Sequence, residues 1–284
     1  MKKLFVLLII GLVIPLLLSG CTKGEEQKTL TAFVGAASKP PMDEAAQAFE
    51  KQTGIKLYST YGGSGTVLSQ MKLAKSGDLY IPGSPDYMVK AERDGVVEPK
   101  SAKIVAYLIP VIAVQRGNPK NIRSLGDLSI PGIKVGIANP EAVCVGLYAV
   151  EILDYNKLLA EVSKNIITYA ESCEKTATLV SLKAVDAVLG WHVFHDWDPE
   201  HIDVVYLKPE QLPRIAYIPA AVSTFSRDKE SARKVIEFLV SPAGQDIFRK
   251  WGYIGSEAEA RKYAPSAKVG GEYQLPEIYK ALVK

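Results

Sequence analysis

Along residues 29–102, short apolar runs alternate with amphipathic stretches, and turns rich in glycine, serine or proline separate them. The expected elements are strands at 30–35, 55–61 and 78–81 and helices at 42–51, from about 65 onward and at 85–93. Alternation of strand and helix is typical of parallel α/β units. The first third of the chain therefore predicts one parallel sheet with helices packed on it.

Two further apolar runs are longer than these predicted strands, and each contains a proline. Residues 104–114 contain Pro110, and residues 215–222 contain Pro219. A second set of strand–helix units lies between them, so we interpret the two runs as crossings between two lobes. Lobe 1 is then expected over residues 29–108 plus 219–284, lobe 2 over residues 109–218, and a ligand would bind in the cleft between them. A single doubly wound domain of the same α/β class is the alternative.

The first residues have the pattern of an export signal. Lys2 and Lys3 precede an apolar run over residues 4–18, and Leu18-Ser19-Gly20-Cys21 has the form of a lipobox. A membrane-spanning anchor is the alternative, but about 15 apolar residues fall short of the roughly 20 that a bilayer requires. We expect a signal peptide over residues 1–20 and a lipidated tether over 21–28. Lipid on Cys21 would hold an extracytoplasmic protein at the cell membrane.

The charge balance argues against a nucleic-acid partner. The chain has 34 Lys and Arg residues against 31 Asp and Glu residues. Loss of Lys2 and Lys3 with the signal peptide brings the mature protein close to neutrality. No cluster of basic residues indicates a nucleic-acid surface.

Two strand-to-helix turns in the first third carry a serine at the same place. Ala36-Ala37-Ser38 follows the first strand, and Gly62-Gly63-Ser64-Gly65 follows the second. At a helix N-terminus the unpaired N–H groups and the helix dipole favour an anion. Serine is also a common N-cap in any protein, so each serine alone has an ordinary structural explanation. Two of them at the carboxyl ends of neighbouring strands favour a binding site.

These motifs are part of a longer ordered set. It consists of Ala36-Ala37-Ser38, Gly62-Gly63-Ser64-Gly65-Thr66, Asp78-Leu79-Tyr80-Ile81, Asn139-Pro140-Glu141-Ala142-Val143 and the tail SPAGQDIFRKWGY. The set resembles the periplasmic molybdate- and tungstate-binding proteins of ABC importers, in a lipoprotein form, over nearly the whole mature chain. The resemblance implies a type II periplasmic-binding-protein-like fold, with two mostly parallel sheets flanked by helices.

The resemblance also implies a ligand and a site. The ligand would be a tetrahedral oxyanion, molybdate or tungstate first, held by the hydroxyls of Ser38 and Ser64 and by backbone amides near Val145 and Cys173. Ala37 and Gly65 are expected beside it. Such a dianion needs only hydrogen-bond donors, and a carboxylate would repel it. Phosphate would be rejected because its remaining proton would find no acceptor. No cofactor is implied, and the partners would be an importer permease and the membrane, with the protein a monomer.

The chain departs from the family pattern at two places. Cys144-Val145-Gly146 stands where the family has proline and a small residue, and a bulkier Val145 would narrow the cavity. Trp191, with His192 next, stands where the family places a tyrosine hydroxyl on the ligand. An indole or imidazole N–H can still donate a hydrogen bond.

Cys144 and Cys173 both fall on loops expected to face the ligand. A disulfide, a pair of free thiols, and a soft metal or metalloid site that includes His192 all stay open from the sequence. The spacing of His192, His195 and His201 matches no compact zinc pattern, so no metal is expected.

Three classes of function can be compared. An enzyme would use Cys144 or Cys173 as nucleophile and His192 as base, but the lipobox, the tether and the family resemblance all favour transport. A lipoprotein that senses a ligand and signals without transport is the alternative. We expect a non-enzymatic solute-binding component of an ABC importer.

Overall fold

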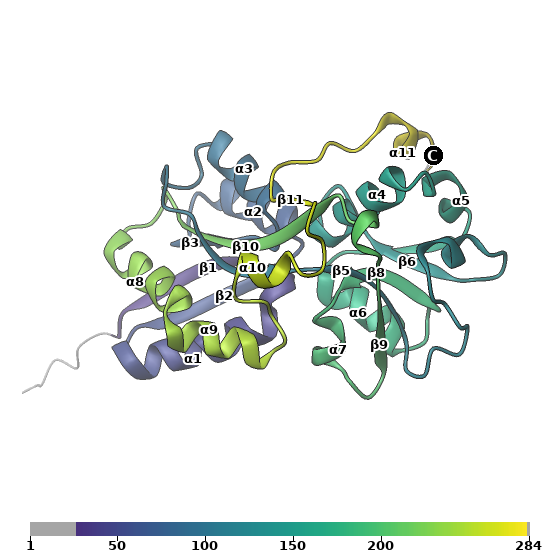
Figure 1. Ribbon diagram of the computed structural model, residues 1–284. Helices are drawn as coiled ribbons and strands as arrows, with labels where there is room; N and C mark the ends of the chain where they lie inside the picture. Colours follow the sequence, from purple (N-terminus) through teal and green to yellow (C-terminus); the bar gives the residue numbers. More distant parts are fainter. Residues whose placement is uncertain (1–26, 283–284) are drawn as a thin grey trace, which may run out of the picture.

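The computed structural model describes residues 27–282, and the α/β class predicted from the sequence is confirmed. Its strands form two separate sheets, which lie side by side in Figure 1. The first sheet has the order β11-β10-β3-β1-β2, with β4 paired to β10. Its strands are β1 (Thr29–Gly35), β2 (Lys56–Gly62), β3 (Leu79–Ile81), β4 (Lys103–Leu108), β10 (Arg214–Val222) and β11 (Lys268–Val269).

The second sheet has the order β7-β6-β8-β5-β9. Its strands are β5 (Pro110–Gln115), β6 (Val135–Ala138), β7 (Ile166–Ala170), β8 (Ala187–Trp191) and β9 (Ile202–Tyr206). In both sheets the central strands are parallel: β1 pairs in parallel with β2 and β3, and β6 with β7 and β8. Antiparallel strands complete each sheet, β10 in the first and β5 in the second.

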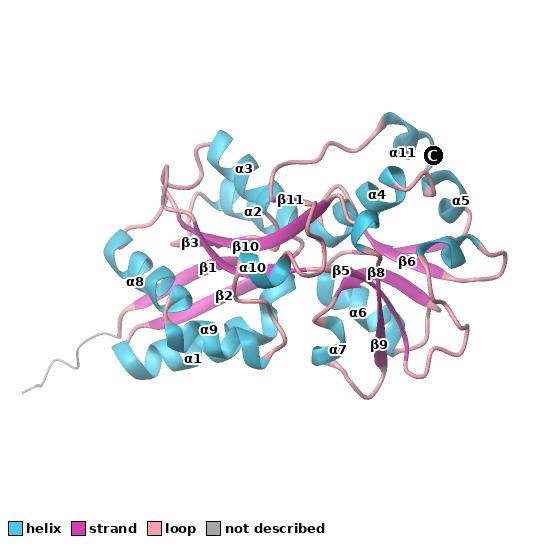
Figure 2. Cartoon of the chain, in the orientation of Figure 1, coloured by secondary structure: helices cyan, strands magenta, loops and turns pink. Residues whose placement is uncertain are grey.

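Helices cover both faces of each sheet (Figures 1 and 2). The first sheet carries α1 (Lys39–Thr53), α2 (Ser64–Ala74), α3 (Pro85–Arg93), α8 (Lys229–Val240) and α9 (Pro242–Lys250), with α10 (Glu257–Ala260) near β4. The second carries α4 (Cys144–Tyr155), α5 (Leu159–Ser163), α6 (Cys173–Ser181), α7 (Phe194–Trp197) and α11 (Glu277–Leu282). Three short 3-10 helices, η1 (Ala36–Ser38), η2 (Leu125–Ser129) and η3 (Pro209–Gln211), lie in connections. We call each sheet with its helices a lobe.

The run at residues 104–114 leads from one sheet to the other. It forms two strands: β4 ends at Leu108 in the first sheet and β5 begins at Pro110 in the second, with the fully buried Ile109 between them. Pro110 has no N–H to donate, and a strand can begin at such a residue without losing a sheet hydrogen bond.

The return connection is not where the second apolar run suggested. β10 pairs with β11 at residues 214–215, with β4 at residues 216–220 and with β3 at residues 221–222, so the whole strand lies in the first sheet. The chain returns earlier, between β9 and β10. Pro219 sits where the register of the β10–β4 pairing shifts, a position that tolerates a missing N–H. The C-terminal segment, expected to lie wholly on lobe 1, reaches lobe 2, where Tyr279 packs in a hydrophobic cluster with Leu159 of α5.

A buried ion cluster joins the two lobes. Arg214 of β10 contacts Asp86 of α3 at 3.0 Å (Nη1–Oδ1) and Glu151 of α4 at 2.6 Å (Nη2–Oε2). All three side chains are almost fully buried, and the guanidinium lies 4.5 Å from the centre of the Tyr148 ring. Burial raises the pKa of Glu151, and the hydrogen bond from Arg214 opposes that rise. The cluster therefore depends on having its single cation in place.

Replacement of Arg214 by methionine is expected to lower the free energy of unfolding by about 3–5 kcal/mol, because it leaves two carboxylates buried without their cation. Arg93→Met is the matched control, since Arg93 forms an exposed ion pair with Glu272 at 2.6 Å, and should cost less than about 1 kcal/mol. Urea denaturation measures both. Equal, small losses would contradict the structural role of Arg214.

Candidate functional site

The two serine turns lie next to each other at one edge of the first sheet. β1 and β2 are paired in register, with Gly35 opposite Gly62, and each strand leads directly into a serine turn. Ser38 is the N-cap of α1, and Ser64 is the first residue of α2. Both side chains are buried. The carboxyl ends of adjacent strands thus bring together the two serines singled out from the sequence.

Neither serine hydroxyl caps its own helix within the described chain. The Ser38 hydroxyl donates to the Gly35 carbonyl at 3.2 Å, and the Ser64 hydroxyl accepts the Gly83 N–H at 3.0 Å. The Ser64 proton is therefore not used in its bond with Gly83. Gly83 follows β3, the neighbour of β1 on its other side, and was missed in the sequence. The rule that sites lie at the carboxyl ends of neighbouring strands would also have indicated Gly83.

Two cysteines face this edge from the second lobe. Cys144 is the first residue of α4 and Cys173 is the first residue of α6, so each stands at a helix N-terminus. The preceding strands, β6 and β7, are parallel neighbours. Both thiols are free and buried, with their sulfur atoms 3.6 Å apart. This lobe repeats the arrangement of the first: two adjacent strands, two turns and two helix N-termini.

The two lobes are in contact at this place. The Gly65 N–H donates to the Ala142 carbonyl at 2.9 Å. A Cβ atom added to Gly83 would lie 2.7 Å from the Cys144 sulfur and 3.6 Å from the Ser64 hydroxyl oxygen. Real Cβ atoms do not come within 2.7 Å of another atom, so the approach of Gly83 to Cys144 requires glycine. The serine turns and the cysteine turns therefore form one buried cluster between closed lobes.

Trp191, at the end of β8, adds a donor to the cluster. Its side chain is fully buried, its ring contacts that of Tyr148 edge-on at 5.2 Å, and its Nε1 has no hydrogen-bond partner within residues 27–282. Burial raises the pKa of the Cys173 thiol well above its ordinary value, and the nearby N–H groups of Trp191 and Val145 counter that rise. The Val145 amide, the Trp191 indole and Cys173, all singled out from the sequence, are thus close together.

His192 is placed differently from these groups. Its Nδ1 accepts the Ile109 N–H at 3.1 Å and its Nε2 lies 3.0 Å from the Gly252 carbonyl, so the proton is on Nε2. Both ring nitrogens are bound to backbone groups and neither is left for a ligand or a metal. In the part of the chain that the structure describes, no three His, Cys, Asp or Glu side chains are grouped to hold a metal ion. The imidazole instead joins β8 to the crossing at Ile109 and to the first lobe at Gly252.

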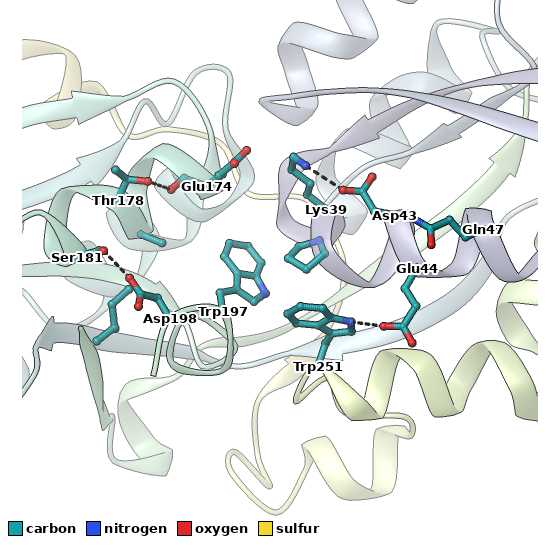
Figure 3. A pocket seen from close by; sticks show the side chains of 13 residues that line it. Lys39, Asp43, Glu44, Gln47, Glu174, Thr178, Ser181, Trp197, Asp198 and Trp251 are labelled. Carbon is teal, nitrogen blue, oxygen red and sulfur yellow. Dashed lines mark hydrogen bonds and ion pairs between the residues drawn. The ribbon is translucent and has the colours of Figure 1, made fainter. Parts of the chain in front are cut away.

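A pocket of about 740 Å³ opens between the lobes beside the buried cluster (Figure 3). Its walls include Lys39 and Glu174, the residues that directly follow Ser38 and Cys173. Trp197 comes from the second lobe and Trp251 from the first, and the Trp251 indole donates to Glu44 at 2.9 Å. The pocket thus borders the first serine turn at Lys39 and the N-terminus of α6 at Glu174.

Comparison with known proteins relates this chain to extracellular solute-binding proteins. The sequence profile of the bacterial extracellular solute-binding proteins matches residues 30–254. A Bacillus subtilis protein, named as a candidate ABC transporter substrate-binding lipoprotein, is 25% identical over 89% of this chain and 99% of its own length. The molybdate-binding protein of Escherichia coli is 21% identical over 89% of this chain and 99% of its own length.

A solved structure shows the same fold. The sulfate-binding protein of Mycobacterium tuberculosis superimposes with a TM-score of 0.73 at 18% identity, over 86% of this chain and 94% of that one. Together with the two sheets, this confirms the type II periplasmic-binding-protein fold expected from the sequence.

The burial of His192 predicts a specific pH dependence. Burial lowers the pKa of His192 from 6.5 to about 4. Between these values the unfolded chain binds a proton that the folded protein excludes, so the free energy of unfolding should fall as pH decreases from 6.5 to 4. The full loss is on the order of 3 kcal/mol.

His192→Gln should remove this part of the pH dependence, while His201→Gln, a change at an exposed histidine, should keep it. Urea denaturation at several pH values between 7 and 4 measures the difference between the variants. An identical pH dependence in His192→Gln and the unaltered protein would show that His192 is not the group responsible.

Proposed function

The chain belongs to the family of bacterial extracellular solute-binding proteins, and we propose that it binds a tetrahedral oxyanion, molybdate or tungstate first, between its two lobes. The family serves ABC importers, so the bound ion would be delivered to an importer permease. The observation that carries the proposal is the buried cluster of neutral donors at the lobe contact: Ser38, Ser64, the Gly83 region, and the N-termini of α4 and α6.

The chemistry of the cluster suits a fully deprotonated dianion. Helix N-termini from both lobes present N–H groups and the positive end of the helix dipole. The Ser64 hydroxyl and the Trp191 indole can donate as well, and the Ser38 hydroxyl can do so once it turns from the Gly35 carbonyl. A dianion accepts from all of these groups and offers no proton in return. Monohydrogen phosphate would bring a proton without a matching acceptor.

The choice between molybdate, tungstate and sulfate depends on the size of the closed cavity. The Escherichia coli relative is named for molybdate, and the Mycobacterium tuberculosis structure for sulfate. Where the related molybdate-binding proteins place a tyrosine, this chain has the larger indole of Trp191. The indole N–H would replace the tyrosine hydroxyl as a donor to the ligand.

The state of the side chains favours binding over catalysis. Burial keeps the Cys173 thiol protonated, and a thiol is a poor nucleophile compared with a thiolate. His192 uses both ring nitrogens on backbone groups and cannot take up a proton from a cysteine. We infer that the protein is not an enzyme and that the lobes open and close around the solute.

The place of action follows from the family and from the N-terminal pattern. Proteins of this family work outside the cytoplasm. Within residues 27–282 no helix is long and apolar enough to span a bilayer. The lipobox at Cys21 and the signal pattern at residues 1–20 lie outside the described residues, and the proposed lipid anchor rests on the sequence and on the lipoprotein name of the Bacillus subtilis relative. We propose a monomer anchored by lipid on Cys21.

The serine pair provides the direct test of the oxyanion site. The double variant Ser38→Ala, Ser64→Ala should lose high-affinity binding, because each lost donor to a charged ligand costs about 1.5–3 kcal/mol. Isothermal titration with molybdate, tungstate, sulfate and phosphate measures the binding. Ser69→Ala is the matched control, since its hydroxyl bonds the Gly65 carbonyl on the exposed side of α2. Unaltered affinity in the double variant would place the site elsewhere.

Trp191→Phe tests the proposed indole donor. Molybdate affinity should fall about 10- to 100-fold, the equivalent of one hydrogen bond to a charged group. Melting curves should show that the ligand-free variant is folded, with a lower melting temperature because the smaller phenyl ring leaves a cavity at this fully buried position. Trp251→Phe is the control, since that indole donates to Glu44 instead. Equal affinity in Trp191→Phe and the unaltered protein would exclude the indole from the site.

A further inference from the structure

The two thiols at the lobe contact are not needed for an oxyanion site. Cys144 and Cys173 begin two different helices, and their sulfur atoms meet at 3.6 Å without forming a disulfide. A tetrahedral oxyanion needs hydrogen-bond donors, and a thiol is among the weakest donors in proteins. Any small residue would supply the same backbone amides. A pair of thiols in contact instead provides two soft ligand atoms on one side of the cleft.

The groups beside the thiols are donors without acceptors of their own. The Trp191 indole N–H and the Tyr148 hydroxyl are both fully buried and have no hydrogen-bond partner in the described chain. The Val145 and Trp191 N–H groups also lie near Cys173, where they counter the rise of its pKa. Tyr148 lies one helical turn after Cys144 on α4. A buried polar group without a partner is costly, so these donors point to a ligand that brings acceptor oxygens.

We propose that Cys144 and Cys173 form a dithiol site for a trivalent metalloid oxyacid, of the arsenous or antimonous acid type. This inference rests on the proposed function, because the ligand would enter through the same cleft between the lobes. The metalloid centre would bind the two sulfur atoms, and its remaining oxygen would accept hydrogen bonds from the surrounding donors.

The binding step is a condensation that balances without an oxidant. Arsenous acid, As(OH)₃, exchanges two As–O bonds for two As–S bonds, and the two thiol protons leave with the two hydroxyl groups as water. One As–OH group remains, and arsenic stays trivalent. The product is neutral, which suits a site whose burial disfavours thiolates.

The surrounding groups disfavour the other thiophilic class, the soft metal cations. A cation bound by two sulfur atoms seeks further electron-pair donors, and His192 is bound to the backbone on both nitrogens. The groups of Trp191 and Val145 that act on Cys173 are N–H donors, whose positive ends would repel a cation. An oxyacid meets the same groups through its oxygen.

The experiment uses reduced, purified protein carrying Cys21→Ser, so that Cys144 and Cys173 are its only thiols. After incubation with sodium arsenite and dialysis, intact-mass spectrometry and elemental analysis measure bound arsenic. We expect one arsenic atom per chain. The intact mass should rise by the mass of one As–OH group less that of two hydrogen atoms. Cys144→Ser and Cys173→Ser should each lose the adduct, because one thiol cannot chelate. Melting curves confirm that both variants are folded.

The serine double variant Ser38→Ala, Ser64→Ala is the matched control, and it should keep the arsenic adduct because its dithiol is intact. Protein loaded with arsenite should no longer bind molybdate, since both ligands need the same cleft. No adduct on the unaltered thiol pair, or an adduct that survives either cysteine substitution, would overturn the proposal. Molybdate titration of untreated protein tests the oxyanion function separately, so either can fail while the other stands.

Discussion

The hydrogen-bond donors buried between the two lobes place the main constraint on this structure. Helices from both sheets begin at this contact, with Ser38 and Ser64 on one side and Cys144 and Cys173 on the other. Closing the lobes removes water from these groups, and some of them, such as the Trp191 indole, then have no protein partner within the described residues. In the proposed function, unsatisfied donors would favour an open state, whereas a ligand rich in acceptor oxygens would favour the closed one. Binding and lobe closure would then be parts of one equilibrium.

Polar side chains also join the lobes away from the donor cluster. Arg214 connects β10 to α4 through Glu151 and to α3 through Asp86. His192 connects the end of β8 to the crossing at Ile109 and to Gly252 of the first lobe. Both residues are buried, and these contacts stabilise the arrangement of the lobes.

The serine and cysteine turns would give the cleft two kinds of chemistry. The serine turns offer hard, neutral donors that suit an oxyanion. The thiols offer soft ligand atoms that would form bonds to the proposed metalloid centre. The two sets come from different lobes and meet through Gly83, where Ser64 and Cys144 both lie close to one glycine. A cleft that combines them would distinguish ligands by covalent chemistry as well as by size.

Local sequence pattern determined much of this protein. The alternation of apolar runs and turns is a local property, and it predicted the parallel units, the helix at residues 42–51 within α1, and serines at the ends of adjacent strands. Tertiary structure decided which sheet each strand joins. An apolar strand such as β10 could be buried in either sheet, so its sequence does not show which one. It also decided that Cys144 and Cys173 lie 3.6 Å apart, that Tyr148 and Gly83 join the cluster, and that His192 turns to the backbone. These contacts join segments far apart in the chain, and their geometry depends on strand order and lobe closure, which no local pattern contains.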